Sequence, residues 1–131
     1  MSKFASGFEG VTREGKPVEL VDAHLEPVGV EITIGPKTSK RYQAAQRRLE
    51  DRYSTGKKVP VKESRELRDS LFLARIEGWR FHGKAAETFG QPEFNPVILK
   101  EFFFESGAVG LAFLEQVKSA IGDYDDFLPE D

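Results

Sequence analysis

The stretch from Leu67 to Lys84 carries the apolar pattern that most restricts how this chain can fold. Two apolar series run side by side in it: Leu67, Leu71, Ala74 and Gly78 form the first, and Phe72, Ile76 and Trp79 form the second. Spacings of three and four predict an amphipathic helix, and a helix apolar on two faces is normally covered on more than one side. We therefore expect a core helix that ends at a glycine cap, Gly78.

Trp79 is the only tryptophan, and it stands where this helix is expected to give way to a short extended piece. We expect the start and the end of the chain both to pack around it. The predicted core accordingly includes residues from two regions of the chain: Leu71, Ile76, Trp79 and Phe113.

The first quarter of the chain carries strand signals. Residues 28–34, VGVEITI, place β-branched side chains alternately on one face, which is typical of a half-buried strand. Residues 17–22 predict a second strand, which a turn at Glu14-Gly15 would join to a weaker one at 8–13. These segments predict a small antiparallel sheet over about residues 8–35, after a loose N-terminus at 1–7.

The remaining chain predicts helices. Thr38 or Ser39 is a candidate N-cap for a helix that runs to about Ser54, and Asn95 followed by Pro96 is a second helix start. Residues 85–90 suggest an irregular turn, Ser106-Gly107 a break, and 108–121 a last helix that Gly122 closes, before an acidic tail at 122–131. We expect a single α+β domain over residues 1–131, with about four helices packed around Trp79.

Charge is unevenly distributed along the chain. The net charge is -3, yet residues 37–68 contain 11 Lys and Arg against four Asp and Glu. Lysines and arginines between 37 and 58 could form a stripe on nucleic-acid phosphates, with Tyr42 and Tyr53 stacking on bases. The alternative is a solvated helix face whose tyrosines belong to the buried stripe. We favour the second interpretation and expect no nucleic-acid partner.

The composition also sets expectations about compartment and chemistry. The chain has no cysteine, its first ten residues lack an apolar signal region, and its apolar runs are short. We expect a cytoplasmic protein that does not enter a membrane. Gly78 to Lys84 matches the spacing of a phosphate-binding loop, but Ala85 replaces the required Ser or Thr. Neither the two histidines nor the acidic tail form a ligand pattern, so we expect no enzyme, metal or cofactor.

The triplet Phe102-Phe103-Phe104 is the clearest candidate for a contact surface. Three successive helical positions span about 200° of the helix circumference, which a single core does not easily cover. Either the helix is wedged between other elements, or one Phe faces a partner. For partner contact, we expect Phe103 or Phe104 together with Phe127.

The order of these features resembles the tail assembly chaperones of long-tailed phages and prophages. The resemblance covers about residues 8–128. It rests on the early strand and helix start, and on these later features: Trp79 before His82-Gly83-Lys84, a turn at Phe89, a helix after Pro96, and Asp123 followed by Phe127-Leu128.

The resemblance implies a chaperone in the cytoplasm of the bacterial host. Such a protein binds the tape measure protein, keeps it soluble and promotes assembly of the tail tube, so the tail tube protein is a second expected partner. Several copies of the chain could also associate with one another. Two alternatives remain open: a structural tail or head-completion component that stays in the virion, and a nucleic-acid-binding phage protein that uses residues 37–58.

Overall fold

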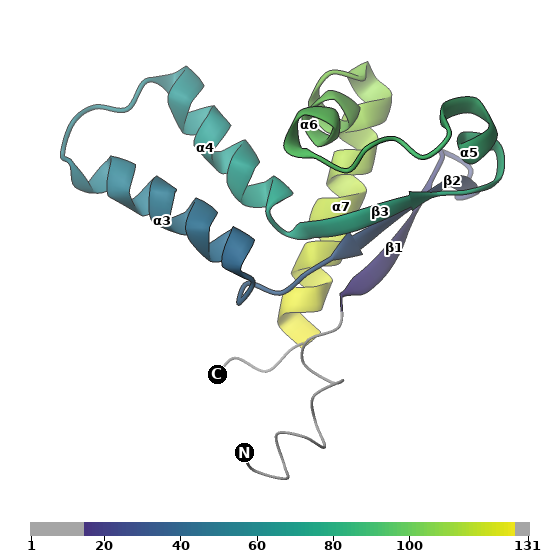
Figure 1. Cartoon of the computed structure of the whole chain (residues 1–131), viewed down its shortest axis with the longest axis horizontal. Helices are drawn as coiled ribbons and strands as arrows, with labels where there is room; N and C mark the ends of the chain where they lie inside the picture. The colour runs from purple at the N-terminus through teal and green to yellow at the C-terminus, as the bar shows by residue number, and fades with distance from the viewer. Residues whose placement is uncertain (1–14, 128–131) are drawn as a thin grey trace, which may run out of the picture.

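The structure is a computed structural model that describes residues 15–127, apart from the side chain of Phe127. Three strands and five helices make up this part of the chain (Figure 1): β1 (Lys16–Val21), β2 (Pro27–Ile34), α3 (Lys40–Ser54), α4 (Val61–Leu73), β3 (Ile76–Phe81), α5 (Gly83–Phe89), α6 (Pro96–Phe104) and α7 (Gly107–Phe127). The strands form one antiparallel sheet in the order β1-β2-β3, which confirms the predicted α+β class. The strand predicted at 8–13 lies outside the described residues.

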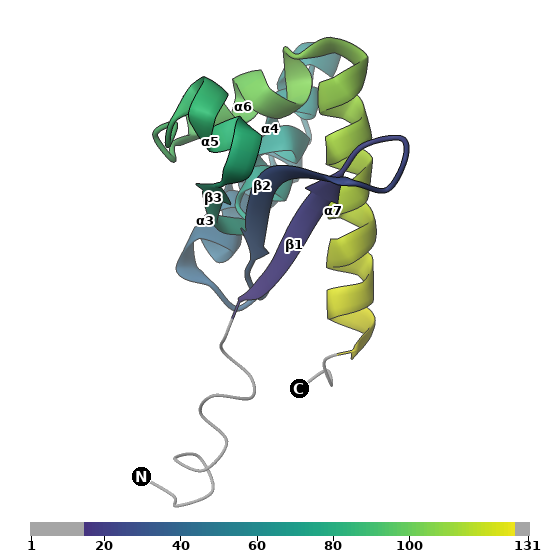
Figure 2. The ribbon, with the colours of Figure 1, turned by 90° about the vertical axis from the view of Figure 1, so that its right-hand side faces the viewer.

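The apolar alternation of β2 determines which face of the sheet is buried. Val30, Ile32 and Ile34 point into the core, whereas the side chains between them are only half-buried. Leu114 and Val117 of α7 belong to the same buried cluster as the sheet residues. Figure 2 shows α7 running along the β1 side of the sheet, whereas α5 and α6 lie toward the β3 side.

The helix predicted across residues 67–78 ends earlier than its apolar spacing suggests. Helix α4 stops at Leu73, and residues from Ile76 onward form β3, the strand next to β2. Gly78 is therefore a strand residue opposite Thr33, and its predicted role as a helix cap is wrong. The physical reason is long-range, because antiparallel pairing with β2 satisfies the backbone of this segment.

Local capping signals are confirmed at two helix starts. The Ser39 hydroxyl accepts a hydrogen bond from the amide of Tyr42 at 3.2 Å, and the Asn95 side chain accepts one from Ile98 at 2.9 Å. Pro96 occupies the first turn, where its missing N–H costs nothing.

Two boundaries after β3 differ from the sequence prediction. Residues 83–89 form helix α5 instead of an irregular turn. Helix α7 continues past Gly122 to Phe127, so the first part of the predicted acidic tail is helical. Gly122 is exposed and has open space around it, and nothing at this position forces the helix to end.

Helices α3 and α4 form a pair that extends to one side of the sheet (Figure 1). Arg52 and Glu63 join them through a two-point ion pair, with Nε to Oε1 at 2.6 Å and Nη2 to Oε2 at 3.0 Å. The hydroxyls of Tyr53 and Ser64 add a 2.6 Å hydrogen bond. None of the helices within residues 15–127 has the length and apolar character needed to cross a membrane.

Candidate functional site

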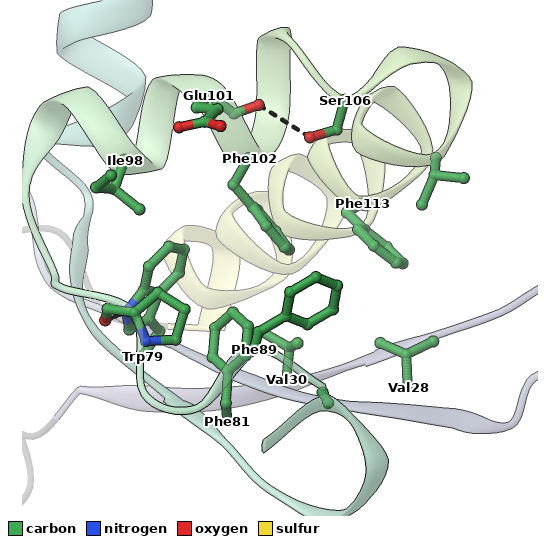
Figure 3. Close-up of a pocket in the computed structure, with 13 residues that line it drawn as sticks. Val28, Val30, Trp79, Phe81, Phe89, Ile98, Glu101, Phe102, Ser106 and Phe113 are labelled. Carbon is green, nitrogen blue, oxygen red and sulfur yellow. Dashed lines mark hydrogen bonds between the residues drawn. The ribbon is translucent and has the colours of Figure 1, made fainter. Parts of the chain in front are cut away.

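An apolar groove opens between the sheet and helices α5, α6 and α7 (Figure 3). Its volume is about 530 Å³, within the range of roughly 300–1,000 Å³ that is typical of ligand pockets. Two strands, three helices and two connecting loops contribute the lining: Val28, Val30, Trp79, Phe81, Ala85, Phe89, Pro92, Ile98, Glu101, Phe102, Ser106, Val109 and Phe113. Glu101 is the one charged residue among them.

Phe102 is the central aromatic residue of the groove wall. Its ring stacks on Phe113 with centroids 5.6 Å apart and an interplanar angle of 12°. It meets Trp79 and Phe81 edge to face, at 5.4 and 6.2 Å. In Figure 3 Phe102 and Phe113 point from the helices toward the sheet. These contacts favour a preformed surface, since each ring restrains its neighbours.

The rim of the groove leaves two large apolar side chains in water. Phe89, at the end of α5, is 67% exposed, and Val109, in the first turn of α7, is 61% exposed. Both line the groove. Exposed apolar side chains beside an open apolar groove favour the binding of an apolar partner, because that contact would remove their surface from water.

The loop between α5 and α6 is tied to β3 at the edge of the groove. The Trp79 indole N–H donates to the carbonyl of Pro92 at 3.0 Å. The Phe81 amide donates to Gln91 Oε1 at 3.1 Å, and Gln91 Nε2 donates to the Phe81 carbonyl at 2.5 Å. These bonds hold the loop, and with it Pro92, against the sheet.

The structure corrects the predicted contact residues of the aromatic triplet. Phe103 is fully buried and meets Phe72 edge to face at 5.8 Å, so its predicted role as an exposed contact is wrong. Phe104 is half-buried and packs against the core, and the side chain of Phe127 lies outside the described residues. Because α6 lies between α4 and α7, the core covers the middle Phe, while Phe102 faces the groove.

The predicted core residues divide into three groups. Ile76 is fully buried, as predicted. Trp79 and Phe113 are half-buried against the core, where both also line the groove. Leu71 is half-buried and does not belong to the buried cluster. Trp79 and Phe113 thus connect the core to the candidate site.

Sequence reasoning missed Phe89, Phe102 and Val109 as lining residues. Val109 begins a series of apolar residues four apart, which assigns it to the buried face of its helix. The first turn of α7 instead leaves it exposed at the groove rim. No local signal distinguishes Val109 from the buried residues of its series. For Phe89, its position directly before Gly90 at a helix end is a weak hint of an exposed aromatic side chain.

Several side chains of the basic segment between Lys37 and Lys58 contact other parts of the fold. Arg41 donates to the Ile76 carbonyl at 3.1 Å, and Arg52 is paired with Glu63 as described above. The Arg75 guanidinium lies over the ring of Tyr42, 5.3 Å from its centroid. Tyr42 is half-buried, as the solvated-face interpretation expects, whereas Tyr53 is 45% exposed and does not belong to a buried stripe. The absence of a nucleic-acid partner stays a prediction.

The groove offers apolar contact and one carboxylate. Within residues 15–127, no three or more Asp, Glu or His side chains come together in a way that could hold a metal ion. The chain matches no protein-family model, no curated protein and no solved structure. The candidate site is therefore interpreted from its own geometry.

Proposed function

We propose that this chain is a tail assembly chaperone of a long-tailed phage or prophage, and that its groove binds an apolar segment of the tape measure protein. In the bacterial cytoplasm it would keep that protein soluble and promote assembly of the tail tube. The observation that carries the proposal is the open aromatic groove with Phe89 and Val109 exposed at its rim. The sequence resemblance supports the choice of partner.

The physical basis is the transfer of apolar surface out of water. An aggregation-prone segment that binds in the groove buries its own side chains together with Phe89 and Val109. A desolvated anchor of this kind typically contributes more than about 1 kcal/mol of binding free energy. The chaperone itself is 31% charged residues, which favours a soluble complex.

Two substitutions on α7 provide a matched test. Val109 lines the groove, whereas Leu111, two positions later and 52% exposed, is not among the lining residues. Val109→Glu places a charge at the rim, and Leu111→Glu places the same charge outside the groove. We expect Val109→Glu to weaken binding of the tape measure protein about tenfold, which corresponds to about 1.4 kcal/mol, and to reduce the soluble tape measure protein recovered on co-expression. Leu111→Glu should retain most of it.

Circular dichroism of both variants controls for loss of fold, and the mass of the complex gives the number of copies bound. Equal solubility of the tape measure protein without this chain would contradict the chaperone proposal. Finding the chain as a stoichiometric part of mature virions would favour the structural tail or head-completion alternative.

A further inference from the structure

We propose that the groove selects a helical segment that carries a lysine or arginine beside its apolar face, with Glu101 as the group that recognises the cation. The inference rests on the proposed function, since it names the chemistry of the segment that the groove would bind. It has two parts: the occupant is a helix instead of an added strand, and it is basic.

The free edges of the sheet argue against strand addition. At Phe81 on β3, the Gln91 side chain occupies both outward backbone groups, the N–H at 3.1 Å and the C=O at 2.5 Å. On β1, Gln116 occupies the same two groups of Val21, at 2.9 and 2.8 Å. Each amide side chain takes the hydrogen bonds that an incoming strand would need. Strand addition is therefore disfavoured at these two positions, which favours an occupant that binds through its side chains.

The walls of the groove suit a helix. The sheet supplies one side through Val30 and Phe81, and three helices supply the others. The lining is apolar along most of this surface, and an amphipathic helix fills such a groove with side chains at successive turns. A helix bound in the groove would cover the apolar surface that the sheet and α5, α6 and α7 leave open (Figure 3).

The charge at the groove favours a basic occupant. Glu101 is the one charged lining residue, and no ion pair to its carboxylate occurs among residues 15–127. The Ser106 hydroxyl, the other polar lining group, already donates to the backbone carbonyl of Glu101 at 3.0 Å. The nearby Lys100 lies toward Asp69 of α4, where its charge lowers the pKa of that carboxyl against the larger effect of burial. An exposed acid, Glu105, follows one turn after Glu101.

A few placed polar groups normally orient a ligand in an apolar site. Here the available group is an unpaired carboxylate, so a cation at the edge of the bound helix would pair with it, whereas an acidic residue there would be repelled. Glu101 thus adds selectivity to a surface whose affinity comes from apolar contact.

The test uses three synthetic peptides of about 18 residues without tryptophan, all with the same leucine stripe. One peptide carries lysines beside the stripe, one carries glutamates there, and one is the lysine peptide with a central proline that breaks the helix. Trp79 is the only tryptophan and lines the groove, so its fluorescence reports binding. We expect the wild-type protein to bind the lysine peptide at least fivefold more tightly than either of the others.

The charge variants separate recognition by Glu101 from the general field of the protein. Glu101→Lys should abolish or reverse the preference for lysine over glutamate, whereas Glu50→Lys, an exposed position on α3, should keep it. Equal binding of the lysine and glutamate peptides, an equal effect of both variants, or no change in Trp79 emission would overturn the basic occupant. Equal binding of the proline peptide would overturn the helix. Each of these results leaves the Val109 test of the chaperone proposal unaffected.

Discussion

Arg75 and Asp125 form a two-point ion pair that joins the turn before β3 to the last turns of α7. Arg75 Nη1 donates to Asp125 Oδ2 at 3.0 Å, and Nη2 donates to Oδ1. Arg75 is only 4% exposed, and its Nε donates to the Gly35 carbonyl at 3.0 Å. The rings of Tyr42 and Tyr124 lie 5.3 and 6.0 Å from its guanidinium carbon. One side chain thus links the end of β2 with α3 and α7.

The first prediction follows from the burial of this arginine. Asp125→Asn removes the charge partner and leaves a buried guanidinium without compensation. We expect the free energy of unfolding to fall by about 2–4 kcal/mol, somewhat less than for a fully buried pair because the Asp125 side chain is 26% exposed. Urea unfolding followed by circular dichroism measures the change.

Lys37 offers a control for that measurement. Its ammonium also lies near Asp125, at 3.7 Å, but its side chain is mostly in water. Lys37→Met should cost less than about 1 kcal/mol, as is usual for surface pairs. Equal effects of the two substitutions would mean that the burial of Arg75 contributes nothing.

The second prediction concerns pH. The hydrogen bonds from Arg75 hold the pKa of the Asp125 carboxyl below its usual value. A lowered pKa in the folded state adds stability above the unfolded pKa, about 3.9, and this stability is lost as pH falls further toward the folded pKa. The stability difference between wild type and Asp125→Asn should therefore be constant from pH 7 to 5 and shrink below about pH 4. A difference that stays unchanged down to pH 3 would contradict the assignment.

The third prediction tests the contact between α6 and α7. A Cβ on Gly110 would lie 2.7 Å from the Phe102 carbonyl oxygen and 2.8 Å from that of Phe103. Gly110→Ala must push the two helices apart, at a cost of about 1–3 kcal/mol. Gly122→Ala, in the same helix but in open space, should instead be neutral or stabilising by up to about 1 kcal/mol. Thermal melts of the pair measure this contrast, and a destabilised Gly122→Ala would invalidate it.

The fourth prediction concerns the covered edge of β3. Gln91→Ala exposes the Phe81 backbone N–H and C=O, and it should lower the unfolding free energy by about 0.5–1.5 kcal/mol. The open edge should also pair with other molecules, so static light scattering should rise with protein concentration. Gln43→Ala, an exposed change on α3, is the control. If the two variants scatter light equally, the edge is not protected by Gln91.

The sequence by itself determined the elements whose signals are local. Strand β2 follows from the alternation of β-branched residues, because the two faces of a strand alternate with every residue. The starts of α3 and α6 follow from Ser39 and Asn95, because a capping side chain reaches an amide only three positions away. The break between the last two helices follows in the same way from Gly107, whose positive φ of 66° suits a residue without a Cβ.

Only the tertiary structure decided the assignment of residues 76–81 and the composition of the groove. The apolar spacing of Phe72, Ile76 and Trp79 fits a helix, yet pairing with β2 makes the last two strand residues. The groove brings together side chains from five elements and two loops, so no single segment carries its pattern. Whether Phe102 or Phe103 faces a partner depends on which neighbours cover α6. Packing between distant segments determines that, and the helical period alone does not.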